Sequence, residues 1–192
     1  MDLWINEDYA DVFAVIAAWI GVLVPWNITY FSLPELGQYL YVRFPLFQVR
    51  YAFGSPLSKG ILFKSAPGAL MYQQGSSLFG EAYLAWVAGA VVFSIAVILS
   101  LGLYFYDDRL EEVPVDFSRI MGWVILVSAG LLTISTWYLM TPGIGSQGVI
   151  YIPIPLGMIG LYIIAGILLF VERRELPSKE TESSGYQVGN GG

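Results

Sequence analysis

Four long uncharged and mostly hydrophobic runs divide the chain into alternating apolar and polar stretches. None of them contains Asp, Glu, Lys or Arg, and they cover residues 12–31, 82–106, 120–140 and 149–171. A helix of about 20 apolar residues is long enough to cross the hydrocarbon core of a membrane. The pattern therefore predicts an all-α membrane protein, a bundle of four transmembrane helices within residues 1–175. The polar, Gly- and Ser-rich segment 176–192 is predicted to be a disordered tail.

The loop between the first two runs, residues 34–81, is too long to be a plain connector. It is rich in aromatic residues, and its short apolar stretches alternate with the turn signals "GSP", "SKG" and "SAPG". It also has a net positive charge. We expect a small, partly β extracytoplasmic cap that lies on the membrane between the first two helices.

One part of this loop, "QYLYVRFPLFQVRYAFG" at residues 38–54, is apolar enough to suggest a fifth membrane span. A helix of this length would reach only about 25 Å, short of a hydrocarbon core of about 30 Å. Each arginine at the centre would cost about 2.5–3.5 kcal/mol, and Pro45 would break the helix at about 3 kcal/mol. We therefore predict two short extended segments with a bend at Pro45, resting at the interface.

The stretch "PWNIT" near the end of the first run contains Pro25, Trp26 and Asn27. Pro25 removes a backbone hydrogen bond and is expected to kink the helix. One interpretation is a binding notch in which Asn27 supplies polar contacts. The other, which we favour, is a kinked helix end with Trp26 anchored at the headgroups.

The polar residues inside the four runs are almost all hydroxyl-bearing. Such side chains normally donate hydrogen bonds to their own helix or to a neighbouring helix. Small residues also recur four apart, as at Ala85 and Gly89, which favours close helix packing. A proton pump or ion carrier usually needs ionisable groups within its spans, so this chain alone does not resemble one.

The 192-residue chain contains no cysteine and no histidine. Disulfides, thiolate chemistry, histidine acid–base catalysis and histidine-held haem are therefore excluded. We expect a non-enzymatic protein with no cofactor, no metal and no nucleic-acid partner. The net charge is −6 and the nine cations include few lysines, which favours a protein that works in high salt.

Cations near the ends of the runs give the expected orientation. Those on the side of the two termini are Arg109, Arg119, Arg173, Arg174 and Lys179, against Arg43 on the other side. The expected location is the cell membrane, with several passes and both termini in the cytoplasm.

The landmarks "LVPWNITYF", "RFPLFQVRYAFGSPL" and "VERRE" follow one another along most of the chain, to about residue 175. In this order they resemble a family of uncharacterised haloarchaeal integral membrane proteins. The resemblance implies a saline habitat and a four-helix membrane architecture. It implies no activity and no catalytic residues.

The most concrete functional hypothesis is contact between the cap and lipids or a partner. The candidate lipid- or partner-binding residues are aromatic or basic, namely Tyr41, Arg43, Phe47, Arg50 and Tyr51. The other interpretation is that both arginines extend to the interface or pair with Glu35 and Glu81. Membrane lipids, another membrane protein and a second copy of the chain are the partners considered. The alternative function is an accessory subunit or oligomeric component of a membrane transporter or channel.

Overall fold

The computed structural model describes residues 4–33, 37–54, 60–73, 79–110, 116–140, 150–170 and 172–174. In chain order the elements are β1 (Trp4–Asn6), α1 (Glu7–Leu23), β2 (Asn27–Leu33), β3 (Gly37–Arg43), β4 (Phe47–Phe53), β5 (Gly60–Ser65), α2 (Ala66–Gln73), α3 (Gly80–Leu110), α4 (Phe117–Met140), β6 (Ile150–Ile154), α5 (Leu156–Phe170) and β7 (Glu172–Arg174). The predicted disordered tail, 176–192, lies outside the described residues.

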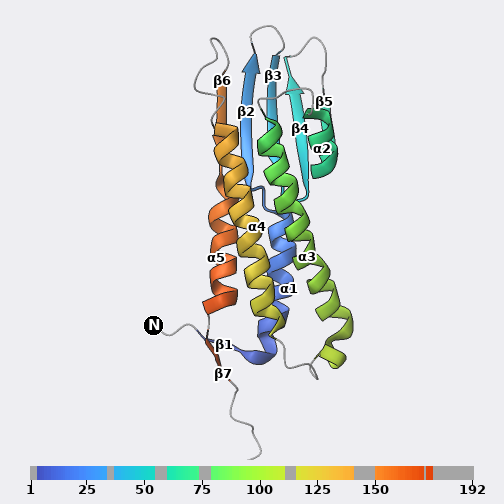
Figure 1. Ribbon diagram of the computed structural model, residues 1–192, viewed down its shortest axis with the longest axis vertical. Coiled ribbons are helices and arrows are strands. Elements are labelled where there is room, and N and C mark those ends of the chain that lie inside the picture. Colours follow the sequence, from blue (N-terminus) through green and yellow to red (C-terminus); the bar gives the residue numbers. More distant parts are fainter. Residues whose placement is uncertain are drawn as a thin grey trace, which may run out of the picture.

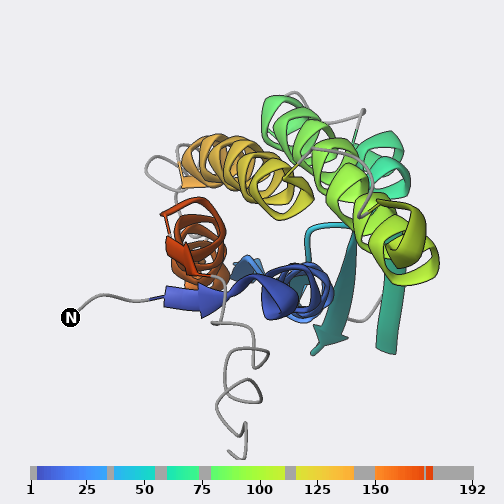
Figure 2. The same cartoon turned by 90° about the horizontal axis from the view of Figure 1, so that it is seen from below.

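A five-stranded antiparallel sheet of order β5-β4-β3-β2-β6 stands at one end of a group of helices (Figure 1). Helices α3 and α4 run along the long axis and reach one side of the sheet, while α1 and α5 lie below it and join directly to β2 and β6 (Figure 1). Seen from below, α3 and α4 form one side of the molecule, and α1 and the strands lie on the other (Figure 2). At the far end β1 pairs with β7 in parallel, which brings the two ends of the described chain together.

The expected all-α fold class is wrong because five strands form a sheet. The expected bundle of four transmembrane helices is also wrong. Among the described residues, two helices, Gly80–Phe105 within α3 and Phe117–Met140, have the length and composition needed to cross a membrane. The apolar parts of the other two, Asp11–Leu23 and Leu156–Phe170, are shorter than the roughly 20 residues that a crossing requires.

The expected helices at 12–31 and 149–171 each contain a strand instead of their outer part. Helix α1 ends just before Pro25, which has no N–H to continue the ladder, and β-forming residues follow it in β2. Residues 150–154 have the same β-branched character, and Pro153 is accommodated because β6 is an edge strand. Each of these two hydrophobic runs, although long enough for a membrane span, therefore consists of a short helix joined end to end to a strand.

The two extended segments predicted on either side of Pro45 are present as β3 and β4, which pair with each other. They are part of a sheet that also recruits β2 and β6 from beyond the loop, so it is larger than the small cap expected between two helices. The sheet has this extent because residues 27–33 supply a strand to both β3 and β6.

The hydroxyl groups of the helices make the bonds predicted for them. Ser128 Oγ donates to the carbonyl of Gly89 at 3.0 Å and Ser135 Oγ donates to that of Ala82 at 2.7 Å, both from α4 to α3. The hydroxyls of Ser94, Ser100, Thr133 and Thr136 donate to carbonyls of their own helices. The two bonds between the helices, from Ser128 and Ser135, are seven residues apart on each helix and hold α3 and α4 close together.

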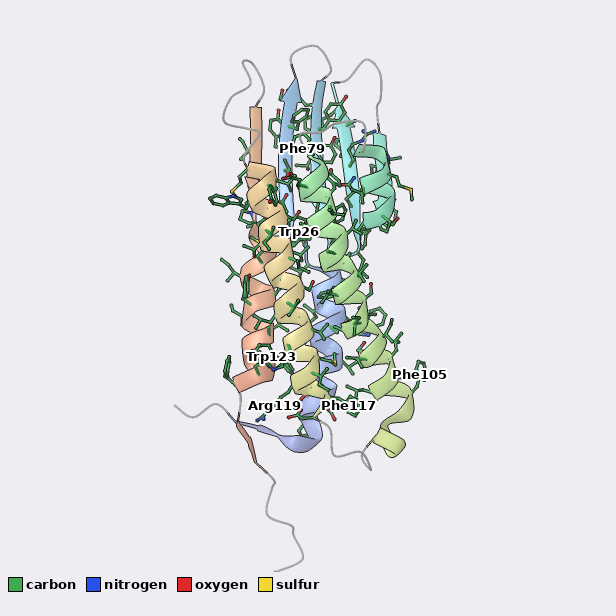
Figure 3. The ribbon with its side chains drawn as sticks, in the orientation of Figure 1. Trp26, Phe79, Phe105, Phe117, Arg119 and Trp123 are labelled. Carbon is green, nitrogen blue, oxygen red and sulfur yellow. The ribbon has the colours of Figure 1, made fainter. Side chains whose placement is uncertain are left out.

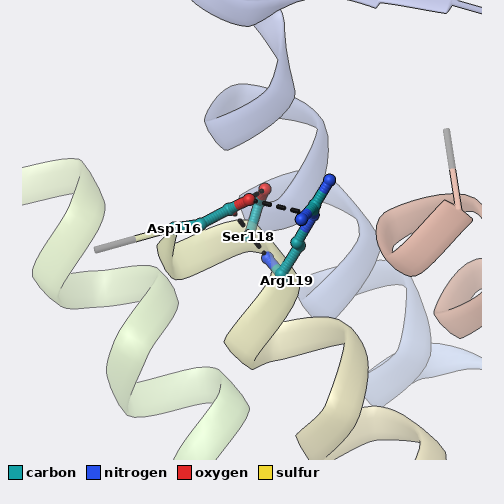
Figure 4. Close-up of polar contacts among 3 residues, drawn as sticks. All are labelled: Asp116, Ser118 and Arg119. Carbon is teal, nitrogen blue, oxygen red and sulfur yellow. Dashed lines mark hydrogen bonds and ion pairs between the residues drawn. The ribbon is translucent and has the colours of Figure 1, made fainter. Parts of the chain in front are cut away.

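Helix α4 begins with a side-chain cap (Figure 4). Asp116 Oδ1 accepts hydrogen bonds from the Arg119 backbone N–H and the Ser118 hydroxyl, both at 3.1 Å. Asp116 Oδ2 also lies 3.1 Å from Arg119 Nε. The carboxylate satisfies an otherwise unpaired N–H and sits at the positive end of the helix dipole.

We predict that Asp116→Ala lowers the free energy of unfolding by about 1 kcal/mol, because the cap bond and the dipole interaction are lost. Asp116→Asn keeps a capping oxygen and is expected to lose less than half of this. Chemical unfolding of purified protein measures both. Equal stability of wild type and Asp116→Ala would show that the cap contributes nothing.

Candidate functional site

The polar residues of the sheet gather on the side that faces the helices. Successive side chains of a strand point to opposite faces, and paired residues share a face. Arg43 pairs with Asn27 on one side and Gln48 on the other, and Tyr41 pairs with Thr29 and Arg50. These residues lie on one face, here called the inner face: Asn27, Thr29, Tyr39, Tyr41, Arg43, Gln48, Arg50 and Lys64. In the described strands of the five-stranded sheet the charged residues are Arg43, Arg50 and Lys64, which are all cations and all belong to the inner face.

The centre of the inner face is the buried guanidinium of Arg43, which is 3% exposed. Its Nη1 donates to Asn27 Oδ1 at 3.0 Å and to Thr29 Oγ1 at 2.6 Å, and its Nη2 donates to the Tyr83 hydroxyl of α3 at 3.2 Å. The Thr29 hydroxyl in turn donates to Asn27 Oδ1 at 2.6 Å. The hydrogen-bond acceptors of this charge are thus uncharged groups of β2 and α3, and through them Arg43 connects β3 to both elements.

Aromatic faces complete the surroundings of both arginines. The Arg43 guanidinium lies 5.2 Å from the Tyr41 ring centroid and 5.6 Å from that of Tyr83. Arg50 lies 5.7 Å from the Tyr39 ring and also hydrogen-bonds to Tyr41. Each cation over a ring in a desolvated site contributes roughly 0.5–2 kcal/mol. The tyrosine rings of β3 and α3 therefore stabilise the arginine charges, which burial would otherwise disfavour.

Burial raises the pKa of the Tyr41 phenol, and Tyr83 acts in the same direction, while Arg50 and Arg43 act to lower it. The net direction is upward, so Tyr41 is a neutral phenol near neutral pH. It cannot serve as a phenolate counter-ion for the arginines, and its contribution is its ring and its hydrogen bond.

The bend at Pro45 joins the sheet to the helices. The indole N–H of Trp26 donates to the Phe44 carbonyl at 3.1 Å, and that of Trp86 in α3 donates to the Pro45 carbonyl at 2.9 Å. Trp26 and Trp86 are 0% and 1% exposed, and their ring centroids lie 6.2 Å apart. Figure 3 shows Trp26 at the junction between α1 and the sheet. The expected kink and headgroup anchor at Pro25, Trp26 and Asn27 is thus a buried helix–strand junction.

The opposite side of the sheet also carries Ser32, Gln38 and Ser65 near the strand ends, and two rows between them cross all five strands. These two rows are here called the outer face. One row follows the pairings of Ile154, Ile28, Val42, Val49 and Phe63, and the other those of Ile152, Tyr30, Leu40, Tyr51 and Ile61. Every member is apolar or aromatic. The sheet therefore has its polar side turned to the helices and its apolar side turned away from them.

The structure divides the five predicted lipid- or partner-binding residues between these two faces. Tyr41, Arg43 and Arg50 belong to the inner face, and Arg43 has no surface from which to reach a lipid headgroup. Phe47 and Tyr51 point to the other side, where Phe47 stacks on Phe63 at 4.9 Å. The five residues therefore do not form one binding surface.

The two arginines and the side chains around them are here called the arginine cluster: Asn27, Thr29, Tyr39, Tyr41, Arg43, Gln48, Arg50 and Tyr83. Four of its members were absent from the sequence-based site: Thr29, Tyr39, Gln48 and Tyr83. Thr29 and Gln48 carry a signal, since a period of two places them beside Arg43 once β2, β3 and β4 are aligned. Tyr83 lies near the start of α3, forty residues from Arg43, and no local pattern indicates their contact.

The cluster also contains buried polar atoms that lack a hydrogen-bond partner among the described residues, Asn27 Nδ2 and Gln48 Oε1. Anywhere among the described residues, no three His, Cys, Asp or Glu side chains come together as a metal site would require. A buried cation with neutral acceptors can fix the positions of the strands and the helix that it connects. The acceptors named here are an amide, a hydroxyl and a phenol, and none of them is a carboxylate or an imidazole, the usual general bases.

The family comparison covers the whole of this arrangement. A model described as "Family of unknown function (DUF7549)" matches residues 3–173, from the start of β1 to the last strand. The chain belongs to this family. The expectation of an uncharacterised family is confirmed, and a search of curated proteins found no match. In this DUF7549 member, the matched region includes the sheet, the arginine cluster and all five helices.

The raised pKa of Tyr41 gives a prediction for alkaline pH. The folded state holds this proton more tightly than the unfolded state, so its contribution to stability is present below about pH 10 and is lost above it. We expect unfolding free energy to fall more between pH 8 and pH 11 in the wild type than in Tyr41→Phe. Tyr51→Phe, on the other face, is the matched control and should behave as the wild type. A drop of the same size in Tyr41→Phe would contradict the prediction.

Proposed function

We propose that the protein is a non-enzymatic integral membrane protein that acts through contacts of its sheet. One observation carries the proposal: the inner face holds the charges of the sheet among the helices, and the outer face presents only apolar and aromatic residues. A protein surface of this kind is typical of a contact site. The fixed cations and neutral acceptors of the inner face favour a structural role for the cluster.

The exposed surface of the helices supports the membrane assignment. Large hydrophobic side chains are exposed along the two long helices, among them Leu84, Val91, Ile95, Ile98, Phe105, Trp123, Val127 and Ile134. Water would disfavour such a surface, whereas hydrocarbon would not. In this proposal α3 and α4 cross the membrane, and the shorter α1 and α5 pack on them. Trp123 and Phe105 lie on the lower part of these helices in Figure 3.

The proposed orientation follows from the end of the molecule that holds β1 and β7. The C-terminal end of α3 and the first turn of α4 lie there too (Figure 1). The cations of this end among the described residues are Arg109, Arg119, Arg173 and Arg174. Because cytoplasmic segments are rich in Lys and Arg, we place this end and both termini in the cytoplasm and the sheet outside.

A high-salt habitat is a second part of the proposal. The acidic, lysine-poor composition supports it. Thermal stability should then rise as KCl is raised from low to molar concentrations, because salt screens the repulsion among the carboxylates. A midpoint that falls or stays constant with KCl would contradict a halophilic origin.

The contact function is tested by two measurements on the same preparation. Phe63→Glu, which places a charge on the outer face, should abolish any higher-mass assembly seen by native electrophoresis of solubilised membranes. Gln38→Glu, exposed on β3 beyond the two apolar rows, is the control and should leave it intact. Purified protein in liposomes should give no flux of small ions. Sustained flux would instead favour the alternative, a component of a transporter or channel.

A further inference from the structure

We infer that the outer face is the binding site for a second copy of this chain, so that two sheets pack face to face. The inference rests on the proposed membrane function, and it names the partner of the surface described there. Its starting point is the completeness of the apolar pattern. Both rows of the outer face run across five strands without a charged residue, and their edges are well exposed, with Ile61 at 72% and Phe63 at 63%.

The size of the outer face fits a protein partner. Five strands about 4.8 Å apart and about 20 Å long give a flat area of roughly 500 Å² on each copy. Two such faces bury about 1,000 Å², the lower limit of a specific interface. Helix α1, which lies below β2 (Figure 1), also exposes large apolar side chains, namely Val12, Ile16, Ile20 and Leu23.

Lipid does not fit the outer face equally well. The edge strands β5 and β6 present backbone N–H and C=O groups that hydrocarbon cannot satisfy, so an open sheet is not stable within the membrane core. The strands also run along the same axis as α3 and α4 (Figure 1). If these helices cross the membrane, the outer face stands upright above it and cannot lie flat on the headgroups.

A second copy meets the remaining requirements. Two molecules inserted in one membrane in the same orientation hold their sheets at the same height, so a two-fold axis along the membrane normal brings the faces together. Self-pairing places no like charges opposite each other, since the described residues of the face carry none. Aligned sheets pack about 10 Å apart with interdigitated side chains, as β-branched and aromatic residues allow.

The central strand β3 should then lie nearest to its own counterpart, at Val42. The chain has no cysteine, so Val42→Cys introduces a single attachment point for a benzophenone maleimide. After illumination of native membranes, we expect a product of twice the mass of the chain. The matched control is Val91→Cys, which is 60% exposed and belongs to α3 instead of the sheet, and it should give no such product.

Adding Tyr51→Glu to the Val42→Cys chain should reduce the doubled product at least tenfold, because symmetry places the new charge in the interface twice. A product of any other mass would show that a different protein covers the outer face. That result overturns the inference and leaves the proposed contact function standing. Absence of any protein product in native membranes would overturn both. Formation of the doubled product that is unaffected by Tyr51→Glu would place the self-contact elsewhere and contradict the inference.

Discussion

Replacing Thr29 with valine is expected to lower the free energy of unfolding by about 2–4 kcal/mol. The change keeps the shape of the side chain but removes two buried hydrogen bonds, one from the Arg43 guanidinium and one to Asn27 Oδ1. A bond to a charged group contributes about 1.5–3 kcal/mol and a neutral one about 0.5–1.5 kcal/mol. The loss is large because it leaves a buried cation with fewer acceptors. Urea or heat unfolding of purified protein would measure it.

Two further variants show whether the cost comes from the charge. Thr136→Val on α4 is the matched control, since its buried hydroxyl donates to the Leu132 carbonyl of its own helix, and it should cost less than about 1 kcal/mol. Adding Arg43→Met to Thr29→Val should recover part of the loss, because the cation that needed the hydroxyl is gone. Stability of Thr29→Val within about 0.5 kcal/mol of wild type would contradict the account of the cluster.

Gly157→Ala is expected to be the most damaging single-methyl change, at about 3 kcal/mol or more, at the upper end for overpacking. A Cβ at Gly157 would collide with the carbonyl oxygen of Pro25 and would lie 2.9 Å from Val24 Cγ1. Backbone of the α1–β2 junction cannot move aside without disturbing Trp26 and the arginine cluster. The start of α5 therefore approaches this junction closely, as only glycine allows.

Gly160→Ala is the control within the same helix. A Cβ at Gly160 meets nothing within 4 Å, so alanine should be neutral or stabilising by up to about 1 kcal/mol through its higher helix propensity. Comparison of the two variants by thermal unfolding separates the collision from the general effect of glycine in α5. Equal stability of both variants would show that the close approach is not a feature of the folded protein.

The two long helices could be predicted because their apolar runs at 82–106 and 120–140 are uninterrupted. The first and last runs were misinterpreted for a specific reason. Hydrophobicity alone does not distinguish a helix of 20 residues from a shorter helix joined to a buried strand. Prolines mark both junctions: Pro25, where a kink within one helix was expected, and Pro153 and Pro155 in the last run.

The arginine cluster was visible in part. A period of two in "YLYVR" and "QVR" places Tyr39, Tyr41 and Arg43 on one face, and Gln48 and Arg50 on one face of the next strand. The bend at Pro45 then brings the two together. The direction of that face could not be read, because in a sheet beside water the polar side would be the exposed one. Contacts with Tyr83 and Trp86 decide it, and both lie on a helix distant in sequence.

The central claim is a membrane protein that holds its sheet on one side and the ends of its chain on the other. Cysteine accessibility tests it most directly, since every introduced cysteine is unique. Gln38→Cys on β3 and Arg119→Cys in the first turn of α4 are both exposed positions at opposite ends of the molecule. With a membrane-impermeant maleimide, we predict labelling of Gln38→Cys on intact cells and of Arg119→Cys only after permeabilisation. Labelling of both positions from the same side, or recovery of both in the soluble fraction, would contradict the account.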